Sequence, residues 1–184
     1  MMQATEADLF PSELERYLSE NIPMASVLGI NVKQASLDSV IIGAPLSLNV
    51  NHRGTVFGGS ASAVAILAGW LLVYVQLRAK AAASNIVIQR NEIRYLTPIT
   101  CDFEARARLS NDENWGDFLR MLARRKKSRV NVSVDLTCKG ALVGEFSGSF
   151  VAMADQPFNP VALVGLTTCQ SAGPCGADSG RDRS

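Results

Sequence analysis

The alternation of apolar and polar residues predicts six β-strands. It is clearest in residues 129–138, where Val130, Val132, Val134, Leu136 and Cys138 fall on one face, as in a strand buried on one side. Lys139 and Gly140 predict a tight turn after this strand. The expected strands are a hairpin within 28–49 that turns near 36–39, then single strands at 85–98, 102–110, 129–138 and 141–153.

Two helices are predicted by a different periodicity. Residues 11–22 carry an apolar stripe of Leu14, Tyr17 and Leu18, with Ser12 as the expected N-cap and Pro23 as the stop signal. The second helix is expected from about Gly59 to Ala83 and is apolar on all sides. Such a helix is typical of a protein core or of a membrane span.

The charge-free stretch 54–77 is long enough to cross a bilayer core of about 30 Å. We favour a core helix and expect no membrane insertion, because the first residues of this stretch have loop chemistry. The predicted strands also need an apolar helix to cover them. The expected fold class is therefore α+β, an antiparallel sheet of about six strands around one long apolar helix.

Length and composition fit one domain with a tail. The domain is expected to span 1–154, and residues 155–184, which are rich in Ser, Gly and Asp, are expected to be disordered. Cys169 and Cys175 lie in that tail and are interpreted as thiols without a role.

Charge and cysteine usage restrict the class of partner. A formal net charge of +1 argues against nucleic acid. Four cysteines without a close CxxC pair, together with a single histidine, do not make the usual zinc clusters. No metal or cofactor is expected. The polar, acidic start lacks a signal-peptide pattern, so we expect a reduced, cytoplasmic protein without a disulfide framework.

The candidate chemistry lies in "VNHRGTVFGGSASAVA" (50–65), where an Asn/His/Gly loop leads into the apolar helix. A helix N-terminus offers unpaired N–H groups and the positive end of the helix dipole. The glycines at 58 and 59 would let a carbonyl group approach the backbone closely. The alternative is that these glycines only permit a tightly packed start of the helix.

The residues "NHRGTVFGGS" (51–60), "GW" (69–70) and "IRYLTPI" (93–99) are similar to the thioesterase-like domain at the C-terminus of YiiD-type proteins. The resemblance covers about 10–153 and implies a hotdog fold. It also implies a substrate that is an acyl thioester of coenzyme A or acyl carrier protein, linked to fatty acid metabolism. The expected assembly is a homodimer, or a dimer of dimers, with the site at the dimer interface.

The resemblance and the helix chemistry together give a set of candidate site residues. The expected catalytic contributors are Asn51, His52, Gly59 and Ser60, and the expected substrate contacts are Gly54, Thr55, Phe57, Gly58, Trp70 and Tyr95. Asn51 could bind the thioester carbonyl or satisfy a local turn, and His52 could be a general base or a structural turn residue. Core packing is the alternative for Trp70 and Tyr95.

Residues 60–77 contain no carboxylate, whereas many hotdog thioesterases carry an acid in the first turns of this helix. The nearest substitutes are Glu92, which is better explained as part of a solvated charge ladder, and Asp102. Two hypotheses therefore stay open. One is a hydrolase that cleaves acyl thioesters, and the other is a module that binds them without hydrolysis.

A basic run, "LRMLARRKKSR" (119–129), is the remaining unusual feature. It could attract coenzyme A phosphates or an acidic carrier protein. We favour the simpler interpretation of a solvated loop and strand edge, where cations prevent aggregation.

Overall fold

The computed structural model describes residues 10–82 and 84–154, which form five helices and six strands. In chain order these are α1 (Pro11–Asn21), α2 (Pro23–Val27), β1 (Asn31–Ala35), β2 (Ser39–Ala44), α3 (Leu46–Asn49), α4 (Gly58–Ala79), β3 (Asn85–Tyr95), β4 (Phe103–Leu109), α5 (Trp115–Arg125), β5 (Lys127–Cys138) and β6 (Ala141–Met153). The expectations for 155–184, including Cys169 and Cys175, lie outside the described residues.

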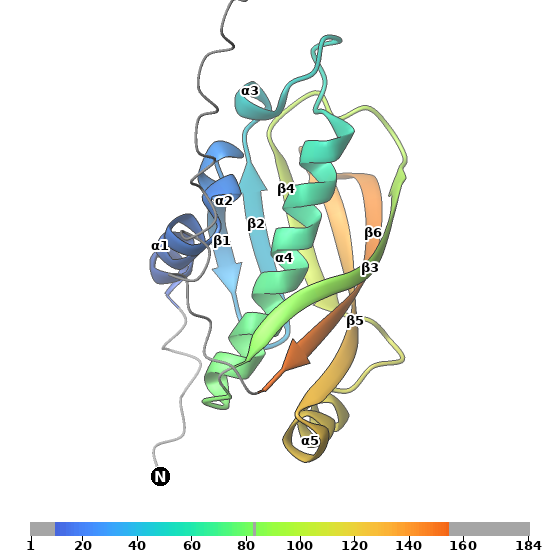
Figure 1. Cartoon of the computed structure of the whole chain (residues 1–184). Coiled ribbons are helices and arrows are strands. Elements are labelled where there is room, and N and C mark those ends of the chain that lie inside the picture. Colours follow the sequence, from blue (N-terminus) through green and yellow to red (C-terminus); the bar gives the residue numbers. More distant parts are fainter. Residues whose placement is uncertain (1–9, 83, 155–184) are drawn as a thin grey trace, which may run out of the picture.

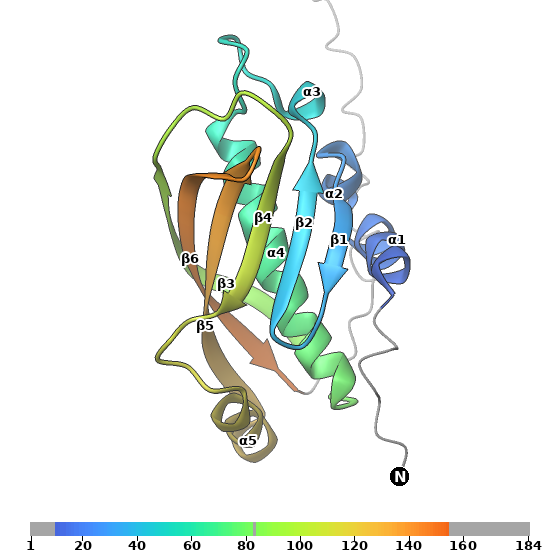
Figure 2. The same cartoon turned by 180° about the vertical axis from the view of Figure 1, so that it is seen from behind.

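The six strands form one antiparallel sheet in the order β1-β2-β4-β5-β6-β3. The sheet curves around α4, which lies along its inner face (Figure 1), while the outer face is open in the opposite view (Figure 2). β1 and β3 are the two edges. The predicted α+β class, the six strands and the central apolar helix are confirmed.

α4 is a core helix rather than an isolated apolar segment. Its buried residues include Val64, Ala68, Leu71, Leu72 and Val75, which belong to the main apolar cluster of the domain. Close packing also explains Gly69, since an added Cβ there would lie 2.8 Å from the Phe150 ring on β6. The sheet thus buries these residues of α4 and excludes water from one side of the helix.

The β5–β6 hairpin follows the predicted pattern. Val130, Val132, Val134 and Leu136 are all buried on the inner face of β5. Lys139 and Gly140 connect the strands, with φ angles of 50° and 79°. Two successive left-handed residues match the right-handed twist of the strands they join.

Two predicted boundaries of the helices are wrong. The N-cap of α1 is Phe10 without a side-chain hydrogen bond, not Ser12, because the helix already begins at Pro11. α4 ends at Ala79 instead of Ala83. The predicted end of the first helix is confirmed, since α1 stops at Asn21, before Pro23. Pro23 then starts a second short helix, α2, because proline is well suited to a first helical position.

The interpretation of 119–129 as a loop and strand edge is also wrong, because most of this run belongs to α5. Asn114 caps the helix by accepting hydrogen bonds from the N–H groups of Gly116 and Asp117 at 2.7 and 3.2 Å. An apolar stripe at helical spacing packs α5 against the core; it consists of Trp115, Phe118, Leu119 and Leu122. The basic residues therefore project from the helix end and the start of β5.

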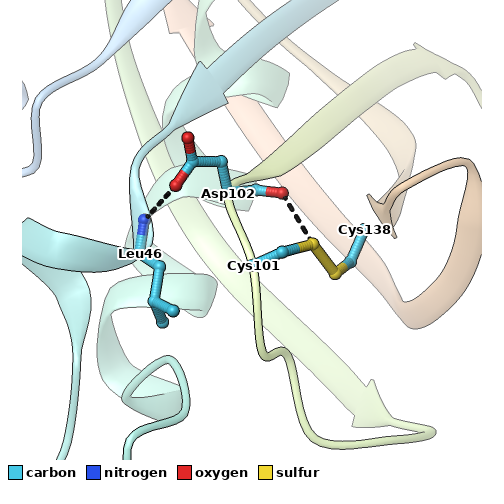
Figure 3. The surroundings of a disulfide bond; sticks show 4 residues. All are labelled: Leu46, Cys101, Asp102 and Cys138. Carbon is cyan, nitrogen blue, oxygen red and sulfur yellow. Dashed lines mark hydrogen bonds between the residues drawn. A yellow bond between two sulfur atoms is a disulfide. The ribbon is translucent and has the colours of Figure 1, made fainter.

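A disulfide joins Cys101 and Cys138 (Figure 3), which contradicts the expected absence of disulfides. The cause is the register of the sheet. Phe103 on β4 pairs with Cys138 on β5, which brings Cys101, two residues earlier, within 6.1 Å between Cα atoms. The two cysteines are 37 residues apart in the sequence, so this proximity depends on strand pairing.

The disulfide predicts a measurable loss of stability on reduction. A cross-link between residues 37 apart stabilises a fold by about 3 to 4 kcal/mol, chiefly by restricting the unfolded chain. We expect Cys101→Ser to lower the free energy of unfolding in urea by this amount, and a reductant to have the same effect on the wild type.

The control is the variant Cys169→Ser/Cys175→Ser, in which only the Cys101–Cys138 pair can form. It should retain the wild-type stability and the sensitivity to reductant. Free thiols at both Cys101 and Cys138 under non-reducing conditions, detected by alkylation and mass spectrometry, would contradict the assignment.

Candidate functional site at the start of α4

The loop before α4 is held in a defined conformation by its own backbone. The Asn51 N–H donates to the Thr55 carbonyl at 2.7 Å, and the Gly54 N–H donates to the Asn51 carbonyl at 3.1 Å. Val50 and Val56 form an antiparallel bridge below the turn. Gly54 has φ +75° with open space around it, so glycine is required there for its backbone conformation.

The Asn51 side chain organises this loop. Its Oδ1 accepts from the N–H groups of Arg53 and Thr55, and its Nδ2 donates to the Thr55 hydroxyl at 2.9 Å and to the Val56 carbonyl at 3.4 Å. Both ends of the amide are therefore engaged within the loop. This arrangement corresponds to the local-turn alternative raised for Asn51.

His52 lies at the exposed tip of the same loop. Its Nε2 accepts a 3.3 Å hydrogen bond from the Arg53 Nε. The imidazole is therefore close to the start of α4 in sequence and open to solvent. It is not enclosed by the walls of the pocket described below.

The N-terminus of α4 presents unpaired hydrogen-bond donors. Phe57 is the N-cap and provides no side-chain acceptor. The first hydrogen bond into the helix runs from the Ala61 N–H to the Phe57 carbonyl at 3.1 Å. Within the described part of the chain, the N–H groups of Gly58, Gly59 and Ser60 have no acceptor. Donors of this kind stabilise negative charge.

Two aromatic rings lie against the glycines at this helix start. An added Cβ on Gly58 would lie 3.2 Å from the Tyr95 hydroxyl, and one on Gly59 would lie 2.3 Å from the Phe57 ring. Close packing thus accounts for part of the need for glycine. Phe57 is 59% exposed, so its ring is not locked in place by a surrounding core.

Tyr95, at the end of β3, fastens the helix start to the sheet. Its hydroxyl donates a 2.7 Å hydrogen bond to the Gly58 carbonyl. Partial burial raises the pKa of the Tyr95 hydroxyl above its usual value of 10.0, because desolvation disfavours the phenolate. The side chain is therefore a neutral donor at physiological pH.

A pocket of about 340 Å³ lies between the helix start and the β3–β4 connection. Its lining residues are Thr55, Val56, Gly58, Ala61, Tyr95, Leu96, Thr97, Pro98 and Ile99. The Val56 N–H donates to the Ile99 carbonyl at 2.8 Å and so ties the loop to that connection. The lining is mainly apolar and contains no charged residue.

The structure brings most of the predicted site residues together. Thr55, Gly58 and Tyr95 line the pocket, and the other predicted residues of 51–60 lie in the loop or at the helix start that borders it. Trp70 does not belong to this group. It lies about 16 Å further along α4, stacks with Tyr74 and Tyr17, and donates from Nε1 to the Ile86 carbonyl at 3.2 Å.

Two parts of the site are missing from the sequence-based residue set. The pocket wall 96–99 belongs to the "IRYLTPI" motif, so the family resemblance of this motif could have indicated these residues as part of the site. Asn49 is buried, and its side-chain Nδ2 donates to the Leu28 and Pro45 carbonyls. Its main-chain carbonyl accepts a hydrogen bond from the Phe57 N–H. Nothing in the sequence distinguishes this buried asparagine from an ordinary turn residue.

The two candidate acids lie outside the pocket. Asp102 accepts a 2.8 Å hydrogen bond from the Leu46 N–H at the start of α3 (Figure 3). Glu92 is exposed on β3 and lines a separate hollow with Arg94 and Glu145. In the described residues, no group of three His, Cys, Asp or Glu side chains could hold a metal ion.

Residues 11–154 match the protein family described as "Putative thioesterase (yiiD_Cterm)". The match covers most of the chain, and the protein belongs to this family.

Solved structures support the same fold. A "putative thioesterase" from Shewanella oneidensis is 29% identical, with a TM-score of 0.70 over 78% of this chain and 96% of its own. A protein of unknown function from Chlorobaculum tepidum is 23% identical, with a TM-score of 0.74 over 81% and 99%. A thioesterase from Haemophilus influenzae is 16% identical, with a TM-score of 0.64 over 81% and 94%. The chain has the hotdog fold of these thioesterases, as the resemblance implied.

The environment of Tyr95 predicts an unusual titration. The raised pKa means that the hydroxyl stays protonated to higher pH in the folded protein than in the unfolded chain. Its contribution to stability is therefore present below pH 10 and is lost as the pH rises through the raised pKa. The phenolate absorbance that disappears in Tyr95→Phe should titrate above the usual value. A component titrating at or below that value would contradict the geometry.

Proposed function

We propose that the protein hydrolyses an acyl thioester of coenzyme A or acyl carrier protein at the N-terminus of α4. The observation that carries this proposal is the set of three unpaired N–H groups, on Gly58, Gly59 and Ser60, beside an apolar pocket. Membership of a thioesterase family supports it.

In the proposed reaction, a water molecule attacks the thioester carbonyl carbon. The carbonyl oxygen becomes an oxyanion, which accepts hydrogen bonds from the N–H groups of Gly59 and Ser60. Collapse of this tetrahedral intermediate breaks the carbon–sulfur bond and yields a carboxylic acid and a thiol. Backbone donors aimed at the developing charge are effective because they need no reorganisation during the reaction.

Asn51 and His52 have different proposed roles. The Asn51 amide is used inside the loop, so we assign it the task of holding the loop and the first turn of α4 in place. His52 is the histidine next to this turn, and an imidazole nitrogen can accept a proton from the attacking water. Because it is exposed in one chain, we infer that bound substrate and a second subunit complete its surroundings.

A homodimer is proposed from the edge strand β3. Among the described strands β3 pairs only with β6 and forms one edge of the sheet, which is a template for pairing with a second copy. Beside it, α4 carries a half-buried apolar stripe of Ala63, Ile66, Trp70 and Tyr74. Antiparallel pairing of two β3 edges would cover both features with one two-fold interface.

A second candidate function is binding of the acyl thioester without hydrolysis. The specific observation in its favour is that the described pocket lining contains no carboxylate or histidine. The helix N-terminus would still bind a carbonyl oxygen in such a module.

The two candidate functions are separated by thiol release from a panel of acyl-coenzyme A and acyl carrier protein substrates. We expect turnover, and we expect Gly59→Ala to lower kcat by about 100-fold, because a methyl group displaces the carbonyl from the N–H donors. Stability should not fall, since alanine favours the helix and Phe57 is free to move. Ser62→Ala is the matched control.

Asn51→Ala and His52→Ala extend this experiment. Turnover unaffected by both variants would contradict the roles assigned here. Tight substrate binding without thiol release from any substrate would favour the binding module over the hydrolase.

The proposed dimer is tested by sedimentation. The wild type should have twice the chain mass of 19.8 kDa. Val87 on β3 is 45% exposed, so Val87→Lys should leave the fold intact and shift the equilibrium to monomers, since lysine on an edge strand opposes pairing. Lys33→Gln on the other edge strand is the control. A wild-type monomer at micromolar concentration would contradict the proposal.

A further inference from the structure

Positive charge is concentrated in one short segment of the protein. Residues 115–129 contain six Lys or Arg residues and one Asp, a formal charge of +5, although the whole chain carries only +1. The remainder of the chain is therefore net acidic, and this segment forms a local positive pole. We call Arg124, Arg125, Lys126, Lys127 and Arg129 the basic turn.

All five residues of the basic turn are exposed, and none forms an ion pair within the described part of the chain. The opposite face of α5 is occupied, since Phe118 and Leu122 are buried in the core. Arg124 and Arg125 suit the negative end of the helix dipole. That effect does not account for the three further cations that follow.

The conformation of Lys126 is informative. It occupies the left-handed C-cap position of α5, with φ 58°. Glycine is the preferred residue at such a position, because a side chain there is strained. The protein thus has a cation where helix termination alone would favour glycine.

The end of α5 and the start of β5, which carry the basic turn, lie at the opposite end of the sheet from the start of α4 (Figures 1 and 2). Lys127 on β5 pairs with Met153 on β6, which also pairs with Asn85 at the start of β3. The pocket is at the other end of β3, beside Tyr95. The strand between them is about 33 Å long, so the basic turn does not serve the pocket of the same chain.

A second subunit would bring its basic turn close to this pocket. In the antiparallel β3 pairing proposed above, the Asn85 end of one subunit lies beside the Tyr95 end of the other. The partner's basic turn then begins three strands from Tyr95, about 14 Å across the sheet. Each pocket is thereby flanked by the cations of the other subunit.

We propose that the basic turn is a docking surface for an acidic acyl carrier protein, which delivers its thioester to the pocket of the partner subunit. The inference rests on the proposed function and specifies the carrier. The cations project from a helix end and a strand start, and they line neither the pocket beside Tyr95 nor the hollows beside Asp102 and Glu92, which have volumes of about 340 to 380 Å³. An exposed group of five cations outside these pockets suits an acidic protein surface better than a single phosphate group.

Other anionic partners fit less well. A lipid surface would require apolar side chains beside the cations, but the apolar stripe of α5 faces the core. Nucleic acid would require basic charge beyond this segment, whereas the rest of the chain is net acidic.

The test compares two variants that each remove two positive charges from the full-length protein. Lys126→Gly/Lys127→Gln changes the basic turn and relieves the left-handed strain, and Lys80→Gln/Arg106→Gln changes exposed cations elsewhere. We expect the first variant to lower kcat/KM for acyl carrier protein substrates about 10-fold, because steering is lost. The control variant should stay within about twofold of the wild type, as should turnover of acyl-coenzyme A by both variants.

Salt should abolish the difference, because about 1 M salt reduces the Debye length to about 3 Å. An equal loss for acyl-coenzyme A would assign the basic turn to coenzyme A phosphates and overturn the proposal. An equal effect of the control variant would overturn it as well.

Binding of fluorescently labelled holo-acyl carrier protein separates this inference from the proposed function, because it requires no turnover. Salt-sensitive binding that weakens in Lys126→Gly/Lys127→Gln supports docking even if no thioester is cleaved. Binding that is equal in wild type and variant overturns docking even if hydrolysis is observed.

Mixed dimers test delivery between subunits. One subunit carries Gly59→Ala with an intact basic turn, and the other carries Lys126→Gly/Lys127→Gln with an intact pocket. After subunit exchange, half of the dimers are mixed and each holds one complete site, so activity on the carrier substrate should recover to about a quarter of the wild type. No recovery would mean that the basic turn does not serve the partner's pocket.

Discussion

The burial of α4 inside the curved sheet is the interaction on which the rest of the structure depends. This helix is apolar on nearly every side, so it is stable in water only while strands surround it. The sheet covers one side, and α1 adds Tyr17 against Trp70 and Tyr74. The half-buried stripe of α4, which consists of Ala63, Ile66, Trp70 and Tyr74, lies next to the edge strand β3. The proposed dimer would therefore complete the burial of α4 that the core begins.

The N-terminus of α4 lies beside the connection between β3 and β4. The β3–β4 connection contacts the loop before α4 through Val56 and Ile99, contacts α3 through Asp102 and Leu46, and is cross-linked to β5 through Cys101. Three independent interactions therefore fix the short segment 96–102. One wall of the pocket is this segment and another is the first turn of α4, so the same interactions hold both walls in place.

Local pattern was sufficient for the strands and the core helix, because alternation and uniform apolarity are properties of contiguous residues. α5 was predictable from Asn114 and the stripe of Trp115, Phe118 and Leu122, but the run of charge obscured it. The disulfide and the pocket wall depend on strand register, which relates residues far apart in the sequence. Asn51 shows a different limit. Its residue type suits both a substrate contact and a turn, and only the atoms bonded to its amide distinguish them.

The strand order has a consequence for synthesis on the ribosome. α4 emerges after only β1 and β2, and four of the six strands that build its sheet are still to come. β3 is made next, but its only partner is β6, the last strand of the described chain. The segments made before α4, among them α1 and β2, cover only part of this membrane-length apolar helix. Its burial is therefore completed only when β6 pairs with both β3 and β5 at the end of synthesis, and until then its apolar surface favours aggregation.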